Sequence, residues 1–473
     1  MDQTLPHPSN RASRKRYAMV RPNHRSMHGY GLRCTDMVCS AVIRNAMHRS
    51  RAFVPALAIF LAACVPGIIE PPTPFRAADT PVPIAEVQPT VEASVVPEEP
   101  DEPSEPTATP RVAIPAQPVE EPHLDVGQPV VIDQIRMDSA HDGWAIGSHS
   151  TADPAPSVHV LRTHDGGRTW GEVTPPEDNN LMTDIGGIHS SGSNAWVIYL
   201  GTDRVWRTTN WGKTWTASEA GYPEGQFSAF EFTDAQHGWM LQEVESGFGS
   251  QLISLFRTID GGDTWSEIIN PYESEDLQSC RKTGMSFSGT DVGWVTYDCE
   301  GTYLEAFLDV SIDGGESWTE GQLPLPEDAA QSTDQGWCSS SSPRLTGEAS
   351  GSLIVTCVKD EGSALTKRTH LYQTEDAGET WEISDYPGGE PQFFNDGTIL
   401  ALGRDQYLST DGGESWTKIK IVNWDGQYSF VDPSKGWAVA TNEGETALVV
   451  TTDGGRTWDI VEPTIVSGSG DPS

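Results

Sequence analysis

The sequence predicts an all-β fold, a seven-bladed β-propeller, over residues 130–463. An octapeptide that ends in tryptophan recurs seven times in this region, and alternating, strand-like segments flank each copy. The closing tryptophans follow one another at spacings of roughly 35–63 residues, and periods near 40–50 with strand-like content indicate propeller blades. A different phasing of the strands would give six or eight blades instead.

The octapeptide predicts a tight turn between two strands. It reads THDGGRTW at 163–170, TTNWGKTW at 208–215, TIDGGDTW at 258–265, SIDGGESW at 311–318, TEDAGETW at 374–381, STDGGESW at 409–416 and TTDGGRTW at 451–458. The aspartate can accept bonds from nearby backbone N–H groups, and the glycines tolerate positive φ. These structural aspartates are Asp165, Asp260, Asp313, Asp376, Asp411 and Asp453. The indoles expected to fill the space between neighbouring sheets are Trp170, Trp215, Trp265, Trp318, Trp381, Trp416 and Trp458.

A second signature, turn residues followed by an apolar strand, precedes most of the octapeptides. It reads HDGWAIG at 141–147, NAWVIY at 194–199, HGWML at 237–241, VGWVTY at 292–297 and KGWAVA at 435–440. Each repeat therefore supplies four strands, A to D, with the Asp turn between C and D. Because each blade comes from one contiguous stretch, we expect no strand to be exchanged between the first and last blades. Side-chain packing alone would then close the ring.

The octapeptide pattern Ser/Thr-x-Asp-x-Gly-x-Ser/Thr-Trp resembles the Asp-box, or BNR repeat. Sialidases, sortilin-type receptors, some xyloglucan hydrolases and photosystem II assembly factors contain this repeat. The Gly-Trp strand before each box is most similar to the photosystem II assembly-factor family, whose members are seven-bladed lumenal or periplasmic propellers. The resemblance implies a non-enzymatic module that binds a partner or assists assembly of a complex.

Residues 1–63 differ in charge from the rest of the chain. They hold ten basic and two acidic side chains, whereas the whole chain holds 30 basic and 68 acidic ones. Basic residues from Met47, an apolar run from 52 to 63 and then Cys64 resemble a bacterial lipoprotein signal. We interpret residues 1–46 as upstream sequence that precedes the true start at Met47. We expect a signal peptide at 47–63 and lipidation at Cys64. The alternative is an ordinary signal whose cleavage site contains a cysteine.

Residues 64–129 are expected to form a disordered tether. Positions 65–129 hold 16 of the 34 prolines, interleaved with glutamate, threonine, alanine and valine. This composition cannot bury a core. The tether would hold the propeller, residues 130–463, away from the membrane that carries the lipid anchor. Residues 464–473 are expected to be a flexible tail.

Four cysteines remain within the propeller, an even number in an exported chain, and this suggests two disulfides. The interval from Cys280 to Cys299 equals the interval from Cys338 to Cys357. Overlaying the two intervals places an A–B hairpin inside each, so we predict Cys280–Cys299 and Cys338–Cys357. The crossed pairing would bridge neighbouring blades and is disfavoured. Intervals this wide also disfavour zinc, whose ligands usually come in close pairs.

The formal charge of −38 argues against a nucleic-acid partner, because such proteins need basic surface. No phosphate loop, nucleophile elbow or His-rich pattern is present, so we expect no cofactor and no metal. Aromatic residues in D–A connections, on the face opposite the Asp turns, are candidate ligand contacts. They are Trp337, Trp424 and Tyr272.

These observations lead to one main functional expectation and one alternative. The main expectation is a monomeric, lipid-anchored, non-enzymatic propeller of the bacterial cell envelope that binds an unknown extracytoplasmic protein or glycan. The sialidase Arg-Ile-Pro motif is absent near the N-terminus. The alternative is a sialidase-like or xyloglucanase-like glycoside hydrolase whose catalytic carboxylates the sequence does not reveal.

Overall fold

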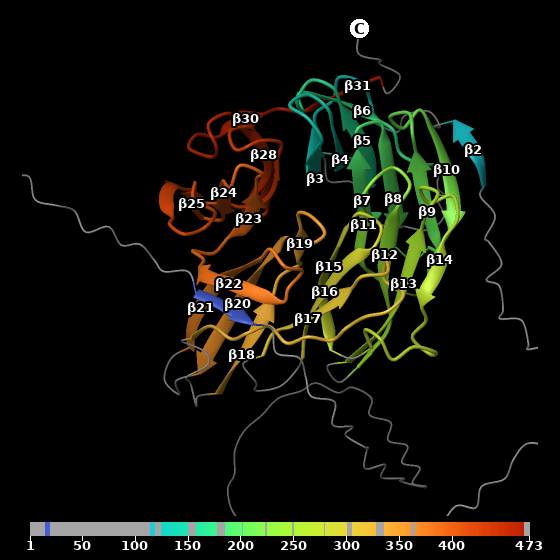
Figure 1. The fold of residues 1–473 in the computed structure, drawn as a ribbon. Coiled ribbons are helices and arrows are strands. Elements are labelled where there is room, and N and C mark those ends of the chain that lie inside the picture. The colour runs from blue at the N-terminus through green and yellow to red at the C-terminus, as the bar shows by residue number, and fades with distance from the viewer. Residues whose placement is uncertain are drawn as a thin grey trace, which may run out of the picture. The chain divides into compact units, whose positions relative to one another are not determined.

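The structure, a computed structural model, describes the propeller with a few gaps. The described residues are 15–18, 114–118, 124–149, 158–176, 185–200, 202–222, 225–247, 250–278, 280–299, 305–327, 335–360 and 365–467. They form seven small sheets in a ring, antiparallel except for one parallel strand in blade 1, which confirms the seven-bladed β-propeller (Figure 1). The signal peptide, Cys64 and most of the proposed tether lie outside the described residues. Among the described residues, no helix is long and apolar enough to cross a membrane.

The first four blades follow one another along the chain. Blade 1 contains β3 (Val130–Met137), β4 (Gly143–His149), β5 (Val158–Thr163), β6 (Thr169–Glu172) and β31 (Thr464–Val466). Blade 2 contains β7 (Ile185–Ser191), β8 (Asn194–Tyr199), β9 (Arg204–Thr208), β10 (Thr214–Glu219) and β2 (Ile114–Pro118). Blade 3 contains β11 (Gln226–Phe232), β12 (Gly238–Gly247), β13 (Ser250–Thr258) and β14 (Ser266–Ile269). Blade 4 contains β15 (Arg281–Ser288), β16 (Val292–Asp298) and β17 (Phe307–Ser311).

The remaining three blades complete the ring. Blade 5 contains β18 (Gln335–Ser340), β19 (Arg344–Leu345), β20 (Gly351–Asp360), β21 (Leu365–Thr374), β22 (Thr380–Asp385) and β1 (Lys15–Ala18). Blade 6 contains β23 (Glu390–Phe393), β24 (Ile399–Leu402), β25 (Asp405–Ser409) and β26 (Thr417–Ile421). Blade 7 contains β27 (Asp425–Phe430), β28 (Gly436–Asn442), β29 (Glu445–Thr451) and β30 (Asp459–Val461). In blade 4 two isolated bridges, Phe307–Gln322 and Val310–Thr319, take the place of a continuous fourth strand.

The first strand of each blade lies nearest the axis of the ring. Strand β27 contacts β3, β7 contacts β11, and β11 contacts β15. Each of these strands is the edge of its sheet, so the N–H groups on its unpaired side need partners outside the sheet. Side chains of the preceding blade supply them: Ser429 Oγ accepts from Met137 N at 2.8 Å, and Glu231 Oε2 accepts from Phe287 N at 3.0 Å.

The Asp-box turns have the expected chemistry. In blade 1, Asp165 Oδ1 accepts from the backbone N–H groups of Arg168 and Thr169, and Asp165 Oδ2 accepts from the Thr169 hydroxyl. Gly166 and Gly167 have φ of 76° and 88°, values that glycine adopts without strain. In blade 2, Asn210 replaces the aspartate and still accepts from Thr214 N at 3.0 Å.

Tryptophans lie at the interfaces between blades. Of the closing tryptophans expected to fill these interfaces, Trp170, Trp215, Trp265 and Trp381 are buried, whereas Trp318, Trp416 and Trp458 are only partly buried. The described core falls into clusters that each join two neighbouring blades. At the interface between blades 3 and 4, Trp239 is fully buried and stacks on Phe287 at 4.0 Å. Its Nε1 donates to the carbonyl of Gly314, in the Asp box of the next blade, at 2.8 Å. The Gly-Trp indole thus locks onto the following Asp-box turn.

Ring closure differs from the sequence prediction. After blade 7 the chain crosses to blade 1, where β31 runs parallel to β6. Ile465 N donates to Gln128 O at 2.9 Å, and Gly127 N donates to Ile465 O at 2.8 Å. Strand β31 therefore lies between β6 and the segment at 127–128. The expectation that side-chain packing alone closes the ring is wrong, and residues 464–466 are not part of a flexible tail. The signal was weak because Thr464-Ile465-Val466 is a very short apolar run after a proline.

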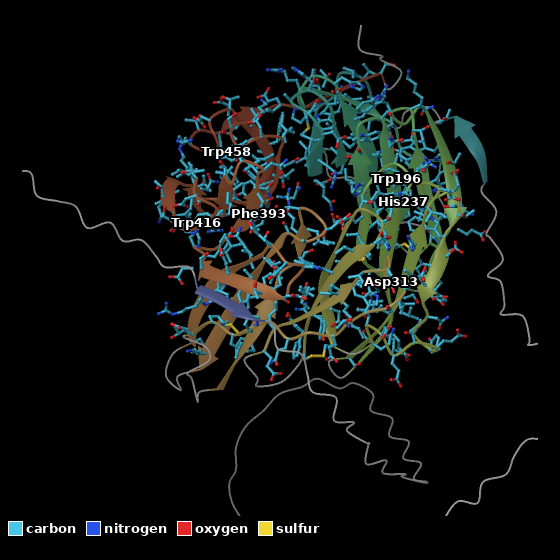
Figure 2. The ribbon with its side chains drawn as sticks, viewed as in Figure 1. Trp196, His237, Asp313, Phe393, Trp416 and Trp458 are labelled. Carbon is cyan, nitrogen blue, oxygen red and sulfur yellow. A yellow bond between two sulfur atoms is a disulfide. The ribbon has the colours of Figure 1, made fainter. Side chains whose placement is uncertain are left out.

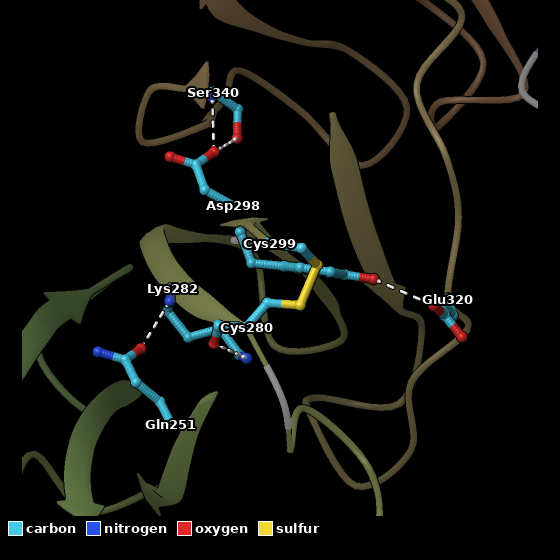
Figure 3. The surroundings of a disulfide bond; sticks show 8 residues. Gln251, Cys280, Lys282, Asp298, Cys299, Glu320 and Ser340 are labelled. Atoms are coloured by element: carbon cyan, nitrogen blue, oxygen red, sulfur yellow. Dashed lines mark hydrogen bonds between the residues drawn. A yellow bond between two sulfur atoms is a disulfide. The ribbon is translucent and has the colours of Figure 1, made fainter. Parts of the chain in front are cut away.

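Both predicted disulfides are confirmed, Cys280–Cys299 and Cys338–Cys357. Each joins strand A to strand B of one blade, and Figure 3 shows the first beside Lys282 and Asp298. The overlay of the two blades also holds, because Gly351 pairs with Thr374 as Gly293 pairs with Ser311. In blade 5 a serine, Ser352, therefore occupies the usual Gly-Trp position.

Candidate functional site

The three aromatic residues predicted to contact a ligand lie on different blades. Trp337 lies in β18, opposite Val358, so its assignment to a loop is wrong, although it is 46% exposed. Tyr272 follows β14 and is 69% exposed. Trp424 follows β26 and its ring packs near Tyr428 and Trp458. Within the described residues no ring contact joins any two of the three, so they do not form one site.

A group of charged residues and one histidine lies instead around the axis of the ring. We call it the axial cluster: Arg136 and Asp138 from β3 and the turn after it, His189 from β7, Glu231 from β11 and Arg344 from β19. All five come from the inner edges of their blades, which the fold brings together at the axis. Sequence reasoning missed them because they are scattered over four blades and belong to no motif.

Glu231 is the titratable centre of the axial cluster. Burial raises its pKa to about 7, although hydrogen bonds from Phe287 N and the Ser286 hydroxyl and the charges of Arg136 and Arg344 act in the opposite direction. A carboxyl with this pKa is protonated in a large fraction of molecules near neutral pH. It can therefore donate a proton to a bound molecule, which an ordinary carboxylate cannot do.

The two arginines beside Glu231 remain accessible to solvent, so a ligand can reach them. Desolvation by the surrounding strands lowers the pKa of Arg136, and Asp138 and Glu231 partly offset this effect. Desolvation likewise lowers the pKa of Arg344, again opposed by Glu231. Guanidinium groups keep their charge under such shifts because their ordinary pKa is above about 12. Both are thus cations held next to an ionisable carboxyl.

The remaining members of the axial cluster are held by neighbouring strands. Asp138 accepts from the Ser190 hydroxyl and from Gly192 N, both at 3.1 Å. Burial nevertheless raises the pKa of Asp138. His189 is 8% exposed, and burial together with the charge of Arg136 lowers its pKa to about 3. His189 is therefore a neutral side chain that packs on Trp196.

A cavity of about 650 Å³ adjoins the axial cluster between blades 5 and 6. Its lining includes Arg344, Gln373, Asp376, Glu382, Phe393 and Asn395. Turn residues of both blades and the blade 5 Asp box take part, so the cavity opens on the Asp-box face. The sequence analysis placed ligand contacts on the opposite face.

Arg344 connects the cavity to the axial cluster. Its guanidinium lies over the Phe393 ring at 5.8 Å, and Figure 2 labels Phe393 in blade 6. The cavity thus combines an aromatic surface, a fixed cation and several hydrogen-bonding side chains. Asp376 adds an ionised carboxylate: burial raises its pKa, but bonds from Thr380 and Thr374 outweigh burial and lower it. A few polar groups around an apolar patch, in a volume of this size, are typical of a small-molecule site.

The described residues contain no group of three or more His, Cys, Asp or Glu side chains that could hold a metal ion. The chemistry available at the axial cluster is that of its side chains: one protonatable carboxyl, a second carboxylate and two guanidinium groups. This set suits proton transfer to a bound molecule that carries oxygen atoms.

The comparisons with known proteins agree with the repeat and the fold. A BNR/Asp-box repeat model matches residues 407–418, the sixth copy of the octapeptide. No curated protein sequence matches this chain. The GH74 enzyme of Niastella koreensis has 14% identity and a TM-score of 0.30, over 69% of this chain and 62% of that chain. A puromycin-hydrolyzing peptidase of Mycobacterium tuberculosis has 11% identity and a TM-score of 0.43, over 76% and 58% of the two chains. The polysaccharide lyase Uly1 has 10% identity and a TM-score of 0.45, over 68% and 90%.

These comparisons correct one expectation and leave another untested. Because the similar solved structures include a GH74 enzyme, polysaccharide lyases and peptidases, the expectation of a non-enzymatic module is not retained. The chain spans about three fifths of the length of the first two of these structures. The finer resemblance to photosystem II assembly factors stays a prediction. At these identities the likeness shows the fold alone: a seven-bladed β-propeller with BNR/Asp-box repeats.

Proposed function

We propose that this chain is a carbohydrate-active enzyme that cleaves a glycosidic bond at the axial cluster. The observation that carries the proposal is Glu231, a carboxyl with a pKa of about 7 that feels the charges of Arg136 and Arg344, the second of which lines the 650 Å³ cavity. Glycoside hydrolysis needs one carboxyl that stays protonated and donates to the leaving oxygen. The environment of Glu231 meets that requirement.

The other members of the site take complementary roles in this proposal. Asp138 is the second carboxylate, and Ser190 and Gly192 fix its orientation. Arg344 and Phe393 hold the sugar: the guanidinium donates to oxygen atoms, and the ring offers a flat apolar surface. Solvent-accessible cations near the axis favour a substrate that carries carboxylate groups.

The test is turnover of a panel of polysaccharides and aryl glycosides by the full chain. We expect Glu231→Gln to lower the rate by about 10²–10⁴-fold, the usual contribution of a general acid. Glu445→Gln, an exposed glutamate at the start of β29, is the matched control. Activity should fall as the pH rises above about 7, because Glu231 then loses the proton it donates. Full activity of Glu231→Gln on every substrate that the chain cleaves would rule out this site.

The location of the enzyme is a separate part of the proposal. We propose that it acts outside the cytoplasm, anchored through a lipid on Cys64. The two disulfides support an oxidising compartment. Metabolic labelling with a radioactive fatty acid tests the anchor directly. Label should be incorporated by the natural chain and lost in Cys64→Ser, and label that persists in Cys64→Ser would contradict the proposal.

A further inference from the structure

A second cavity, of about 460 Å³, lies between blades 6 and 7. It is lined by Lys420, Ile421, Val422, Asn423, Trp424 and Trp458. Lys420 and Ile421 end β26, the outermost strand of blade 6, and residues 422–424 form the connection from β26 to β27 of blade 7, so the cavity follows this connection between the two blades. Figure 2 labels Trp458, which precedes β30.

Two indoles form the apolar wall of this cavity. The rings of Trp424 and Trp458 lie 5.6 Å apart with their planes at 86°. Trp458 Nε1 donates to Gln406 Oε1 at 3.1 Å, which fixes that ring. Both indoles remain partly accessible, whereas Trp437, at the opposite side of blade 7, is fully buried. Packing between blades therefore leaves this pair of indoles only partly covered.

The polar side of the cavity contains a lysine, Lys420, that has no charged partner among the described residues. Lys418 and Lys420 lie two positions apart on β26, and Lys418 Nζ donates to Asp405 Oδ2 at 2.8 Å. No hydrogen bond or ion pair joins the Lys420 ammonium to any residue in the described ranges. Asn423 lies at the same wall. The cavity thus offers an apolar surface, one cation and one amide.

We infer that this cavity is a second carbohydrate site, which binds one hexuronate unit of an acidic polysaccharide. An indole face packs against the apolar C–H face of a pyranose, Lys420 pairs with its carboxylate, and the Asn423 amide bonds to a hydroxyl. The inference rests on the proposed function, because it assigns the substrate class of the same enzyme. A local cation can act in this way despite the net charge of −38, because salt screens charges beyond about 8 Å.

The experiment is calorimetric binding of short galacturonate, glucuronate and mannuronate oligosaccharides to the full chain. The Glu231→Gln variant is used so that the sugar is not consumed. We expect two binding events for at least one oligosaccharide. Trp424→Ala and Lys420→Gln should each weaken one event by about tenfold or more, the effect of a central contact. Lys418→Gln and Trp337→Ala, a paired lysine and an exposed indole outside the cavity, should leave both events unchanged.

The outcomes separate the two proposals. If Arg344→Met removes a binding event and Trp424→Ala and Lys420→Gln change none, the second site is overturned and the active-site proposal stands. If Trp424→Ala removes a binding event but Glu231→Gln never alters turnover, the second site stands and the catalytic assignment fails. Binding of neutral cello-oligosaccharides that is as tight as that of the hexuronates, or binding only of a proline-rich peptide with the sequence of residues 96–106, would also overturn the inference.

Discussion

Truncation of the chain after Pro463 tests how the ring is closed. It removes β31, which lies between β6 and the segment at 127–130. A second truncation, after Ser467, keeps β31 and removes only the residues that follow it. The two truncated chains therefore differ in the closing strand, and a difference in stability between them reports its contribution.

The expected loss can be worked out from the contacts of β31. Ile465 is 2% exposed, and burying one isoleucine contributes roughly 1.5–3 kcal/mol. Its N–H and carbonyl bond to Gln128 and Gly127, and Thr464 N donates to Arg168 O. Each bond contributes about 0.5–1.5 kcal/mol net. Ordering each residue of the strand costs about 1–2 kcal/mol, so these terms nearly cancel. Because Ile465 belongs to the core cluster that joins blades 7 and 1, its removal also loosens that cluster, and we expect a loss of about 1–3 kcal/mol.

Urea unfolding followed by intrinsic tryptophan fluorescence measures this loss. The chain that ends at Pro463 should unfold at a lower urea concentration than the chain that ends at Ser467, which should match the full chain. Ile465→Ala in the full chain should lower the free energy of unfolding by no more than the truncation does. If the substitution weakened β31 further, the strand would detach from β6, and the chain would then behave like the truncated one. Equal midpoints for the two truncated chains would refute the role of β31, and the ring would then be closed by side chains alone.

Three further perturbations test the packing, a buried carboxylate–imidazole hydrogen bond and a disulfide. Trp239→Ala should lower the free energy of unfolding by about 3–5 kcal/mol, because removal of the fully buried indole leaves a cavity. The control Trp337→Ala should lower the free energy of unfolding by less than about 1 kcal/mol, because this indole is exposed. The urea midpoints of the two variants measure the difference. Burial raises the pKa of Glu172, but the hydrogen bond and charge of His159 outweigh it and lower the pKa to about 2; the stabilisation is therefore present above pH 4.5 and lost as the pH falls towards 2. Glu172→Gln should flatten the acid side of the stability–pH curve, and an unchanged curve would contradict the pairing. Cys338→Ser with its partner also replaced should lower stability by about 2–4 kcal/mol in thermal unfolding under non-reducing conditions, and reductant should then have less effect than on the natural chain.

The repeats made the blades predictable because each carries its own local chemistry. The Asp-box fixes a turn within a single octapeptide, and a tryptophan at a constant place in it marks the start of the next strand. The pairing of Cys338 with Cys357 followed from the same regularity, because two equal intervals bracket two equivalent hairpins. Short, local sequence patterns were therefore sufficient to predict the fold, the turns and the disulfides.

The closing strand and the axial cluster escaped prediction for the opposite reason. Ile465 pairs with Trp170 of β6, at the other end of the propeller sequence, and no local pattern indicates such a partner. Glu231 and Arg136 come from different blades, and only closure of the ring brings them near each other. The charge composition gave no help either, since 68 acidic residues conceal any single functional carboxyl.

Glu231 also shows why catalysis and stability must be separated at an inner strand. Its carboxylate accepts from Phe287 N, the edge N–H of the next blade. Glu231→Ala would leave that N–H without its partner at a cost of about 1–3 kcal/mol, so lost activity could reflect a loosened ring. Glu231→Gln keeps a carbonyl oxygen that can accept the same bond and removes only the proton that the carboxyl can donate. If Gln and Ala variants lose activity equally while only Ala lowers the urea midpoint, then the proton, and not the strand edge, is what the proposed activity requires of Glu231.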